Sequence, residues 1–171
     1  MDVNVIDDFL PQKDFEEVRD LMVFNDTFPW YFQKEVNSMG TNCDKDFWNW
    51  YGTHTFYVND FPESKNYPIL YNKFIPCFKE MGIFRNLIRI KGNFYPHTET
   101  LKEHAPHIDY EYSHVGALYS LNTCDGFTKL YDGTKVDSVA NRILIFDAST
   151  IHNSTTTTTS AGRFNINFNF L

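Results

Sequence analysis

Residues 162–170 read GRFNINFNF, and this stretch carries the most regular pattern in the chain. Every second position is apolar and the positions between are polar. The apolar set is Phe164, Ile166, Phe168 and Phe170, and the polar set is Arg163, Asn165, Asn167 and Asn169. Because successive side chains of a strand point to opposite faces, the alternation predicts a strand with one deeply buried face. Its polar face is then expected to meet either solvent or a hydrophilic barrel interior.

The same period of two recurs upstream of this strand. Ile88, Ile90 and Phe94 alternate with the polar set Arg89, Lys91, Asn93 and Tyr95. Two further extended runs cover residues 115–121 and 143–146, whereas the five threonines of 155–159 suit either a strand or a loop. The second half of the chain is therefore expected to be a set of short strands.

Helical periodicity is confined to the first half of the chain. One apolar stripe follows Pro11 and consists of Phe15, Val18 and Met22; a second ends at Gly82, contains Pro76 and consists of Leu70, Phe74, Cys77 and Met81. Both stripes are interpreted as helices that cover a sheet. The order of elements predicts a mainly β fold with N-terminal helices, in the form of a sandwich or barrel with the helices packed outside.

Length and composition limit the possible classes of protein. A chain of 171 residues is expected to form a single domain over 1–171, with a helical and strand support over about 1–85 and a β core over about 86–171. Its 42% hydrophobic and 18% aromatic content excludes disorder. The net charge of −7 argues against a protein that binds a phosphate backbone, so a nucleic-acid substrate is disfavoured.

The cysteines and the chain start predict a cytoplasmic, soluble protein in a reducing compartment. Cys43, Cys77 and Cys124 are far apart and form no CxxC pair, which argues against a disulfide framework or a structural zinc site. The acidic start resembles no signal peptide, and no apolar run approaches the roughly 18 residues of a membrane span. No membrane partner is therefore expected.

The residues with the clearest chemical pattern are His107 and Asp109, which flank Ile108. On a strand, side chains two positions apart project to the same side, so an imidazole and a carboxylate would converge there. His152 follows the apolar run 143–146, and Arg163 opens the alternating final strand. Two histidines and one carboxylate form the facial triad of non-haem Fe(II) oxygenases, and an arginine fork suits the distal carboxylate of an α-keto acid.

At this point the sequence resembles the 2-oxoglutarate- and Fe(II)-dependent oxygenases, most closely the small prolyl 4-hydroxylase-like branch. Six segments carry the resemblance in order and spacing: His107–Asp109, Ala117–Asn122, Gly126–Leu130, Arg142–Asp147, Ile151–His152 and Gly162–Ile166. It implies a double-stranded β-helix (jelly-roll) core flanked by helices. It also implies that His107, Asp109 and His152 bind Fe(II), and that Arg163 holds the C5 carboxylate of 2-oxoglutarate.

The implied reaction consumes O2 and 2-oxoglutarate and hydroxylates a C–H bond, with release of succinate and CO2. Further residues follow from the resemblance: Asn93 and Tyr95 match an Asn-x-Tyr that contacts the oxoglutarate carboxylates in relatives, while Thr128 and Asn165 occupy positions that border the same pocket. Because Asp109 is present, the halogenase variant of this chemistry is disfavoured.

The sequence also departs from the family pattern. Gly126-Phe127 stands where many relatives have Gly-Gly, and Arg163 stands where prolyl hydroxylases often have lysine, which weakens the inference of a prolyl substrate. The segment 96–106 is long enough to cover the mouth of the pocket. His104, within it, is a rival metal ligand that its opposite strand parity disfavours.

The primary substrate stays open, with a peptidyl residue or a small molecule favoured. An aromatic group is interpreted either as the lining of a substrate cleft or, preferably, as packing of an outer sheet; it consists of Trp48, Trp50, Tyr51, His54 and Phe56. Two alternatives to the oxygenase are a cupin-like metal enzyme that does not use 2-oxoglutarate, and a non-catalytic jelly-roll protein with a binding or structural role.

Overall fold

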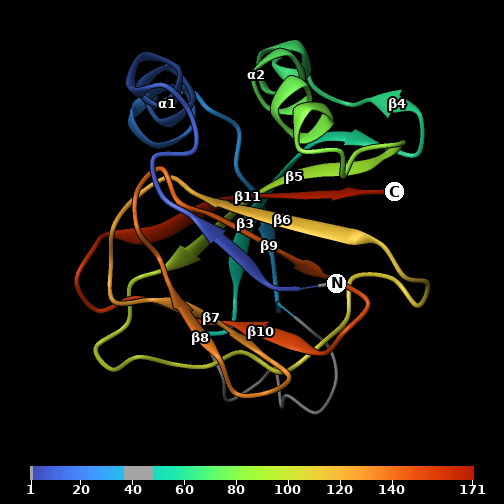
Figure 1. Cartoon of the computed structure of the whole chain (residues 1–171). Coiled ribbons are helices and arrows are strands. Elements are labelled where there is room, and N and C mark those ends of the chain that lie inside the picture. The colour runs from blue at the N-terminus through green and yellow to red at the C-terminus, as the bar shows by residue number, and fades with distance from the viewer. Residues whose placement is uncertain (1, 37–47) are drawn as a thin grey trace.

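Strands make up most of the structure, a computed structural model that describes residues 2–36 and 48–171 (Figure 1). Among these residues, eight strands form one large antiparallel sheet. Across the sheet they run β1 (Asn4–Ile6), β9 (Ile143–Asp147), β6 (Val115–Ser120), β11 (Gly162–Phe170), β5 (Leu87–Pro96), β3 (Tyr51–Val58) and β2 (Tyr31–Gln33), with β4 (Phe61–Pro62) paired to β3. A smaller sheet follows the order β10 (His152–Ser154), β7 (Phe127–Leu130), β8 (Lys135–Asp137).

Both helices cover one face of the large sheet, and the small sheet lies on the other side (Figure 1). α1 (Gln12–Arg19) begins after Pro11 and continues into one π-helical turn, η1 (Asp20–Phe24), while α2 (Tyr67–Glu80) contains Pro76 and ends before Gly82. Gly82 adopts a φ of +72°, a conformation that suits glycine after a helix end. The two predicted helices are therefore present, and they do cover a sheet.

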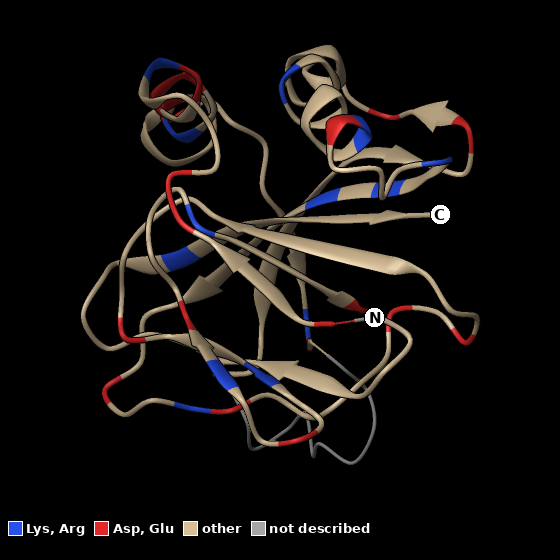
Figure 2. Ribbon diagram, viewed as in Figure 1, with Lys and Arg blue, Asp and Glu red and all other residues tan. Residues whose placement is uncertain are grey.

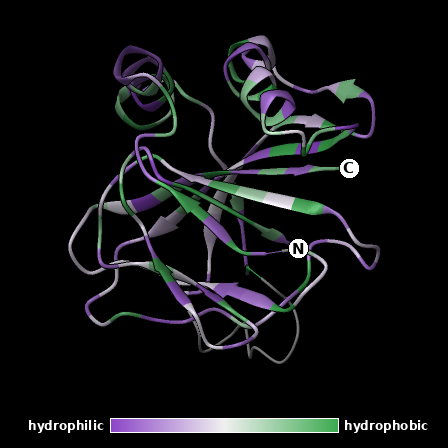
Figure 3. Cartoon of the chain, in the orientation of Figure 1, coloured by the Kyte–Doolittle hydropathy of each residue, from purple (hydrophilic) through white to green (hydrophobic). Residues whose placement is uncertain are grey.

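The core between the helices and the large sheet is rich in aromatic rings. Phe168 on β11 lies with its ring centroid 4.6 Å from that of Phe74 and 5.5 Å from that of Phe78, both on α2. Figure 3 shows mainly hydrophobic residues along β6 and β9 of the large sheet and hydrophilic residues along β10 of the small sheet. Burial of these rings is the main stabilising contribution that the sequence pattern predicts.

The polar face of β11 is as deeply buried as its apolar face. Asn169 has no exposed surface and Arg163 is 1% exposed, although both point away from the helices. β11 pairs with β5 and β6, and this register sets Arg163 opposite Tyr95 and Asn165 opposite Asn93. Of the two predicted environments for this polar face, the structure shows the hydrophilic interior between the sheets.

The fold class predicted from the sequence is confirmed. The protein is mainly β with two helices, and its core is the jelly roll of a large and a small sheet. Cys77 and Cys124 are free thiols, and Cys43 lies outside the described residues. None of the helices in the described part of the chain has the length and apolar character needed to cross a membrane.

The segment 96–106, which is long enough to cover the pocket mouth, runs beside residues 152–157. It is held there by backbone hydrogen bonds from Thr98 to Thr157 and from His104 to Ser154, each 2.9 Å long. The threonine run thus pairs with this segment through its backbone. The hydroxyl groups of Thr157, Thr158 and Thr159 also donate to the carboxylate of Asp125. None of residues 96–106 lines the central cavity.

Candidate metal centre

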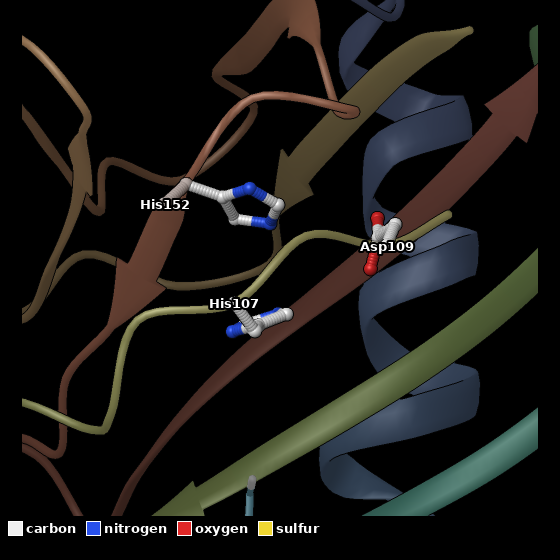
Figure 4. A group of neighbouring side chains, drawn as sticks. All are labelled: His107, Asp109 and His152. Carbon is white, nitrogen blue, oxygen red and sulfur yellow. The ribbon is translucent and has the colours of Figure 1, made fainter. Parts of the chain in front are cut away.

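His107, Asp109 and His152 come together between the two sheets (Figure 4). Each offers one ligand atom, and these atoms all lie within 4.8 Å of one another. Paired backbone hydrogen bonds of 2.9 Å between His107 and His152 fix the separation of the two segments. Ligand atoms about 2.0–2.2 Å from a shared ion lie at most about 4.0–4.4 Å apart, so the three groups would close by a few tenths of an ångström to hold one metal ion.

The His-x-Asp segment corrects one prediction. His107 makes only an isolated bridge to His152, and Asp109 lies in a bend, so neither residue belongs to a strand. The convergence comes instead from backbone hydrogen bonds: His107 is held to His152, and the Asp109 amide donates to the Ala148 carbonyl at 3.1 Å. Ile108 points away and is 38% exposed.

The ring of His152 is oriented for ligation. Its Nδ1 lies 2.9 Å from the Thr150 carbonyl, and since a carbonyl only accepts, Nδ1 must carry the proton. In the neutral ring Nε2 then carries the free lone pair, which is the form in which histidine binds metals. Phe146 supports the ring from the side, with centroids 4.9 Å apart.

His107 is held in its neutral form. Burial, followed by the charge of His152, lowers the pKa of His107 to about 4. Its Nδ1 is buried and has no hydrogen-bond partner among the described residues. Burying a polar nitrogen without a partner destabilises the folded protein, and a metal ion bound there would supply the missing interaction.

Asp109 is surrounded by donors that keep its carboxylate ionised. Arg89 binds Oδ1 at 3.0 Å, and the amides of Asn167 and Asn169 donate to Oδ2 at 2.9 and 2.8 Å. Burial alone would raise the pKa of Asp109, but the charges of Arg89 and His152 and the two amides hold it well below its usual range. These three donors leave lone-pair capacity on Oδ1 for a metal ion.

The donor set suits a divalent transition metal. Two neutral imidazoles and one carboxylate, arranged on one side of an ion, form the facial triad that non-haem Fe(II) enzymes use. The partners of His152 and Asp109 are the outer hydrogen bonds that such ligands need for a fixed orientation. The residues present therefore fit an Fe(II) ion.

A cavity of about 470 Å³, its open mouth included, adjoins these residues. Besides the three ligand candidates, its lining consists of Val36, Tyr51, Lys91, Asn93, Tyr95, Leu118, Thr128, Phe146, Asn153, Ser154 and Asn167. Asn93, Tyr95 and Thr128, which the resemblance assigned to the oxoglutarate pocket, are thus part of its wall. The basic residues of β5 stand out on that strand in Figure 2.

Arg163 lies behind the cavity wall. Its NH2 group donates to Thr128 Oγ1 at 2.8 Å, and its guanidinium lies 5.6 Å from the centroid of the Tyr95 ring. Its Nε is buried without a partner, which leaves a donor available for an anion. Gly126 permits this position, since a Cβ there would lie 2.7 Å from Cδ of Arg163.

Asn165 does not line the cavity but supports its wall. It is fully buried, and its Oδ1 accepts a 2.9 Å hydrogen bond from Nδ2 of Asn93. The Oδ1 of Asn93 and the Nδ2 of Asn165 have no hydrogen-bond partner in the described part of the chain. The pair therefore leaves one acceptor and one donor free beside the cavity.

His104 lies outside the group of metal-ligand candidates. It is 2% exposed, its Nδ1 is 2.9 Å from Ser154 Oγ, and its ring faces Tyr95 at 5.1 Å between centroids. Burial, followed by the charge of Arg163, lowers its pKa to about 3. It acts as a neutral packing residue behind the cavity wall.

The aromatic group from the sequence divides between the two faces of the sheet. Tyr51 lines the cavity and stacks on Tyr95 with centroids 5.9 Å apart, so the preferred packing interpretation is wrong for this residue. His54 and Phe56 pack instead against Phe28 on the helix side. Of the remaining two residues, Trp48 stacks on His104 and Trp50 packs on Phe32.

Sequence reasoning did not assign roles to Arg89, Asn167, Asn169 and Lys91. The first three surround Asp109, and Lys91 lines the cavity. Strand parity is the signal that finds them. Arg89 and Lys91 share a face with Asn93 and Tyr95, and the two asparagines share a face with Arg163.

Comparison with known proteins identifies the fold. A scan against protein-family models found no match, and a search of curated protein sequences found none either. Among solved structures, a prolyl hydroxylase from Trichoplax adhaerens, in complex with a peptide fragment of the hypoxia-inducible-factor oxygen degradation domain, is 15% identical. The match covers 98% of this chain and 83% of the hydroxylase chain, with a TM-score of 0.68.

Two further structures are similar to the same extent. The viral collagen prolyl hydroxylase of Paramecium Bursaria Chlorella virus-1, in a 2-oxoglutarate complex, is 11% identical over 99% of this chain and 96% of its own, with a TM-score of 0.62. A non-heme α-ketoglutarate-dependent epimerase from nogalamycin biosynthesis is 14% identical. This match covers 99% of this chain and 77% of the epimerase chain, with a TM-score of 0.67. The chain therefore has the fold of the small, prolyl 4-hydroxylase-like 2-oxoglutarate- and Fe(II)-dependent oxygenases.

Proposed function

We propose that this chain is a non-haem Fe(II)- and 2-oxoglutarate-dependent dioxygenase that hydroxylates a C–H bond of a peptidyl residue or small molecule, with release of succinate and CO2. The observation that carries the proposal is the meeting of His107, Asp109 and His152, whose ligand atoms lie within 4.8 Å of one another. They meet beside a cavity in a fold that such oxygenases share.

The protein side chains bind and orient the reactants. The imidazoles of His107 and His152 and the ionised Asp109 would hold Fe(II) at the cavity edge. Bound Fe(II) and 2-oxoglutarate would supply the oxidising chemistry with O2, because side chains alone do not activate dioxygen. The protein needs no general base for this reaction, so we assign none.

Arg163 supplies the charge that would hold the far carboxylate of 2-oxoglutarate. It is 1% exposed, no described carboxylate pairs with it, and Thr128 fixes its NH2 group at 2.8 Å. A buried guanidinium binds a carboxylate with a planar fork in a site of low dielectric constant. Thr128 and Tyr95 separate it from the cavity, so we infer that their side chains move or share the anion when 2-oxoglutarate binds.

The similar structures guide the substrate class. One of them holds a protein-derived peptide, and another is an epimerase of nogalamycin biosynthesis. The shared fold therefore serves both peptidyl and small-molecule substrates. We accordingly propose hydroxylation at carbon in either class, without a preference for proline.

The proposal is tested by succinate release from 2-oxoglutarate with Fe(II), over pooled peptides and metabolites. We expect activity in the unaltered protein, none in His152→Ala, and at least a ~10-fold higher half-saturating 2-oxoglutarate concentration in Arg163→Met, from the loss of a charged hydrogen bond of about 1.5–3 kcal/mol. His97→Ala, at an exposed histidine, serves as the control and should match the unaltered protein.

The same assay separates the alternatives. A protein that binds Fe(II) but responds to 2-oxoglutarate neither by binding nor by turnover would be a cupin-like metal enzyme. A protein that binds neither would be a non-catalytic jelly-roll module. Either result would contradict the proposed oxygenase.

A further inference from the structure

Lys91 is a cation in the cavity without a partner anion. It lies on the face of β5 that also carries Asn93 and Tyr95, and it forms part of the cavity lining. No ion pair or hydrogen bond joins its Nζ to any residue that the structure describes; its contact there is with the Tyr51 ring, 5.7 Å from the centroid. A lysine held in this way has unused capacity for an anion.

The other two cations of this region are already assigned. Arg89 is ion-paired with Asp109 at 3.0 Å, and that pair supports the metal ligand. Arg163 is fixed by Thr128 and, under the proposed function, holds the far carboxylate of 2-oxoglutarate. Lys91 is thus the cavity cation, among the described residues, that forms no ion pair, although it feels the charge of Asp109 in the same cavity.

Lys91 belongs to the partly exposed part of the cavity lining. Lys91, Tyr51 and Val36 are each partly exposed, whereas Tyr95 and Thr128, which contact Arg163, are buried. A co-substrate that reaches toward Arg163 occupies the buried part. The partly exposed part, with Lys91 in its wall, is where a primary substrate would enter.

Keeping this ammonium group in the cavity is unfavourable without a ligand. Burial lowers the pKa of Lys91 to about 8, and the charge of Arg89 adds to the effect. A methionine of similar length would fill the same space without the desolvation penalty. An anion that binds at Lys91 would remove that penalty and would gain a charge-assisted hydrogen bond.

We propose that Lys91 binds a carboxylate of the primary substrate, so that the enzyme hydroxylates a carbon of an acidic molecule or residue. This inference rests on the proposed function and narrows its substrate class. One unpaired ammonium group matches one carboxylate, which comes either from a free acid or from an acidic side chain of a peptide. The carboxylate would anchor the substrate at the mouth while its C–H bond faces the metal ligands.

The test measures binding near the metal, so it needs no turnover. The protein is loaded with Mn(II) and saturating 2-oxoglutarate, and the relaxation of probe protons by Mn(II) is titrated by NMR. Two matched probe pairs distinguish the carboxylate sources: N-acetyl-L-glutamate α-amide against N-acetyl-L-glutamine α-amide for a side chain, and N-acetyl-L-alanine against its amide for a free acid.

Lys91→Met and Lys91→Gln remove the charge, and Lys13→Met on the exposed surface of α1 removes a lysine elsewhere. In the unaltered protein and in Lys13→Met we expect the acid of at least one pair to bind at least ~10-fold more tightly than its amide. In both Lys91 variants we expect that preference to vanish, while the affinity for 2-oxoglutarate changes less than ~3-fold. Circular dichroism checks that both variants are folded.

Three results would overturn the inference: no preference for either acid, a preference that survives in the Lys91 variants, or a loss of 2-oxoglutarate affinity as large as the loss for the acid probe. The last result would assign Lys91 to the co-substrate. A protein that binds neither Mn(II) nor 2-oxoglutarate would instead contradict the proposed function itself, so the two failures are distinguishable.

Discussion

The two faces of β11 are buried to the same degree, but one packs against apolar rings and the other against polar groups. Phe168 and Phe170 point to the helices and meet the rings of α2, whereas Asn167 and Asn169 point between the sheets and meet Asp109. One strand therefore contributes to the hydrophobic core and to the candidate metal centre at once. The difference shows that burial alone does not tell a stabilising side chain from a functional one.

The free-energy consequences of the two faces differ in sign. Burial of apolar rings stabilises the fold by roughly 25 cal/mol per Å². Burial of Arg163 and of the asparagines is unfavourable unless their polar atoms find partners, and several of those atoms have none among the residues that the structure describes. We infer that the polar face is retained for ligand binding and not for stability.

The largest expected effect is on the apolar face. Phe168→Ala should lower the free energy of unfolding by about 3–5 kcal/mol, because the ring is fully buried between Phe74 and Phe78. Urea denaturation measures this, and metal affinity of the folded variant should be unchanged. Phe61→Ala, at a ring that is 70% exposed, is the control. A loss below about 1 kcal/mol at Phe168 would contradict the assigned core.

A smaller effect, on metal affinity, is expected when a side chain of the polar face is truncated. Asn169→Ala removes an amide that orients Asp109 at 2.8 Å, and it should weaken Fe(II) or Mn(II) binding by about 10–100-fold. Metal titration gives the affinity, and Asn72→Ala on the exposed side of α2 serves as the control. Unchanged affinity in Asn169→Ala would show that this face does not support a metal site.

The last expected effect is a response to acid at His104, which packs on Tyr95 behind the cavity wall. Burial, with the charge of Arg163, lowers the pKa of His104 to about 3, so below pH ~6.5 the unfolded chain binds a proton that the folded protein does not. The neutral His104 therefore makes its full contribution to the free energy of unfolding above that pH. On acidification below it, the free energy of unfolding falls by up to about 1.4 kcal/mol per pH unit.

The check is urea denaturation of the metal-free protein between pH 7 and 4.5. His104→Gln should reduce the pH dependence by this amount, whereas His97→Gln, at an exposed histidine, should leave it as it is. Equal slopes in the unaltered protein and in His104→Gln would mean that His104 is protonated in the folded state. Phe168→Ala keeps His104 and should therefore keep the pH dependence of the unaltered protein.

Alternation and spacing predicted the fold well. The pattern of 162–170 predicted both faces of β11, and two apolar stripes predicted both helices. These features depend on local periodicity, which one sequence displays in full. The convergence of His107, Asp109 and His152 was predicted from spacing and resemblance, and the structure brings them together.

Features that depend on tertiary pairing were not predictable in this way. The His-x-Asp segment is held by Ala148 and His152 and not by a strand ladder of its own, and only the tertiary structure shows that residues 96–106 run beside 152–157. Arg89 and Lys91 share one strand face, yet only the third dimension shows that the first is paired with Asp109 and the second is unpaired. Register between distant strands decides such partners.

The central claim is that one ferrous ion is bound by His107, Asp109 and His152 and that 2-oxoglutarate binds to that ion. Anaerobic titration with Fe(II) and then 2-oxoglutarate, followed by visible absorption, tests it most directly. We predict a weak charge-transfer band that saturates at one Fe(II) per chain and is absent from Asp109→Ala. A band that persists unchanged in Asp109→Ala, or Fe(II) binding with no spectral response to 2-oxoglutarate, would contradict the assignment.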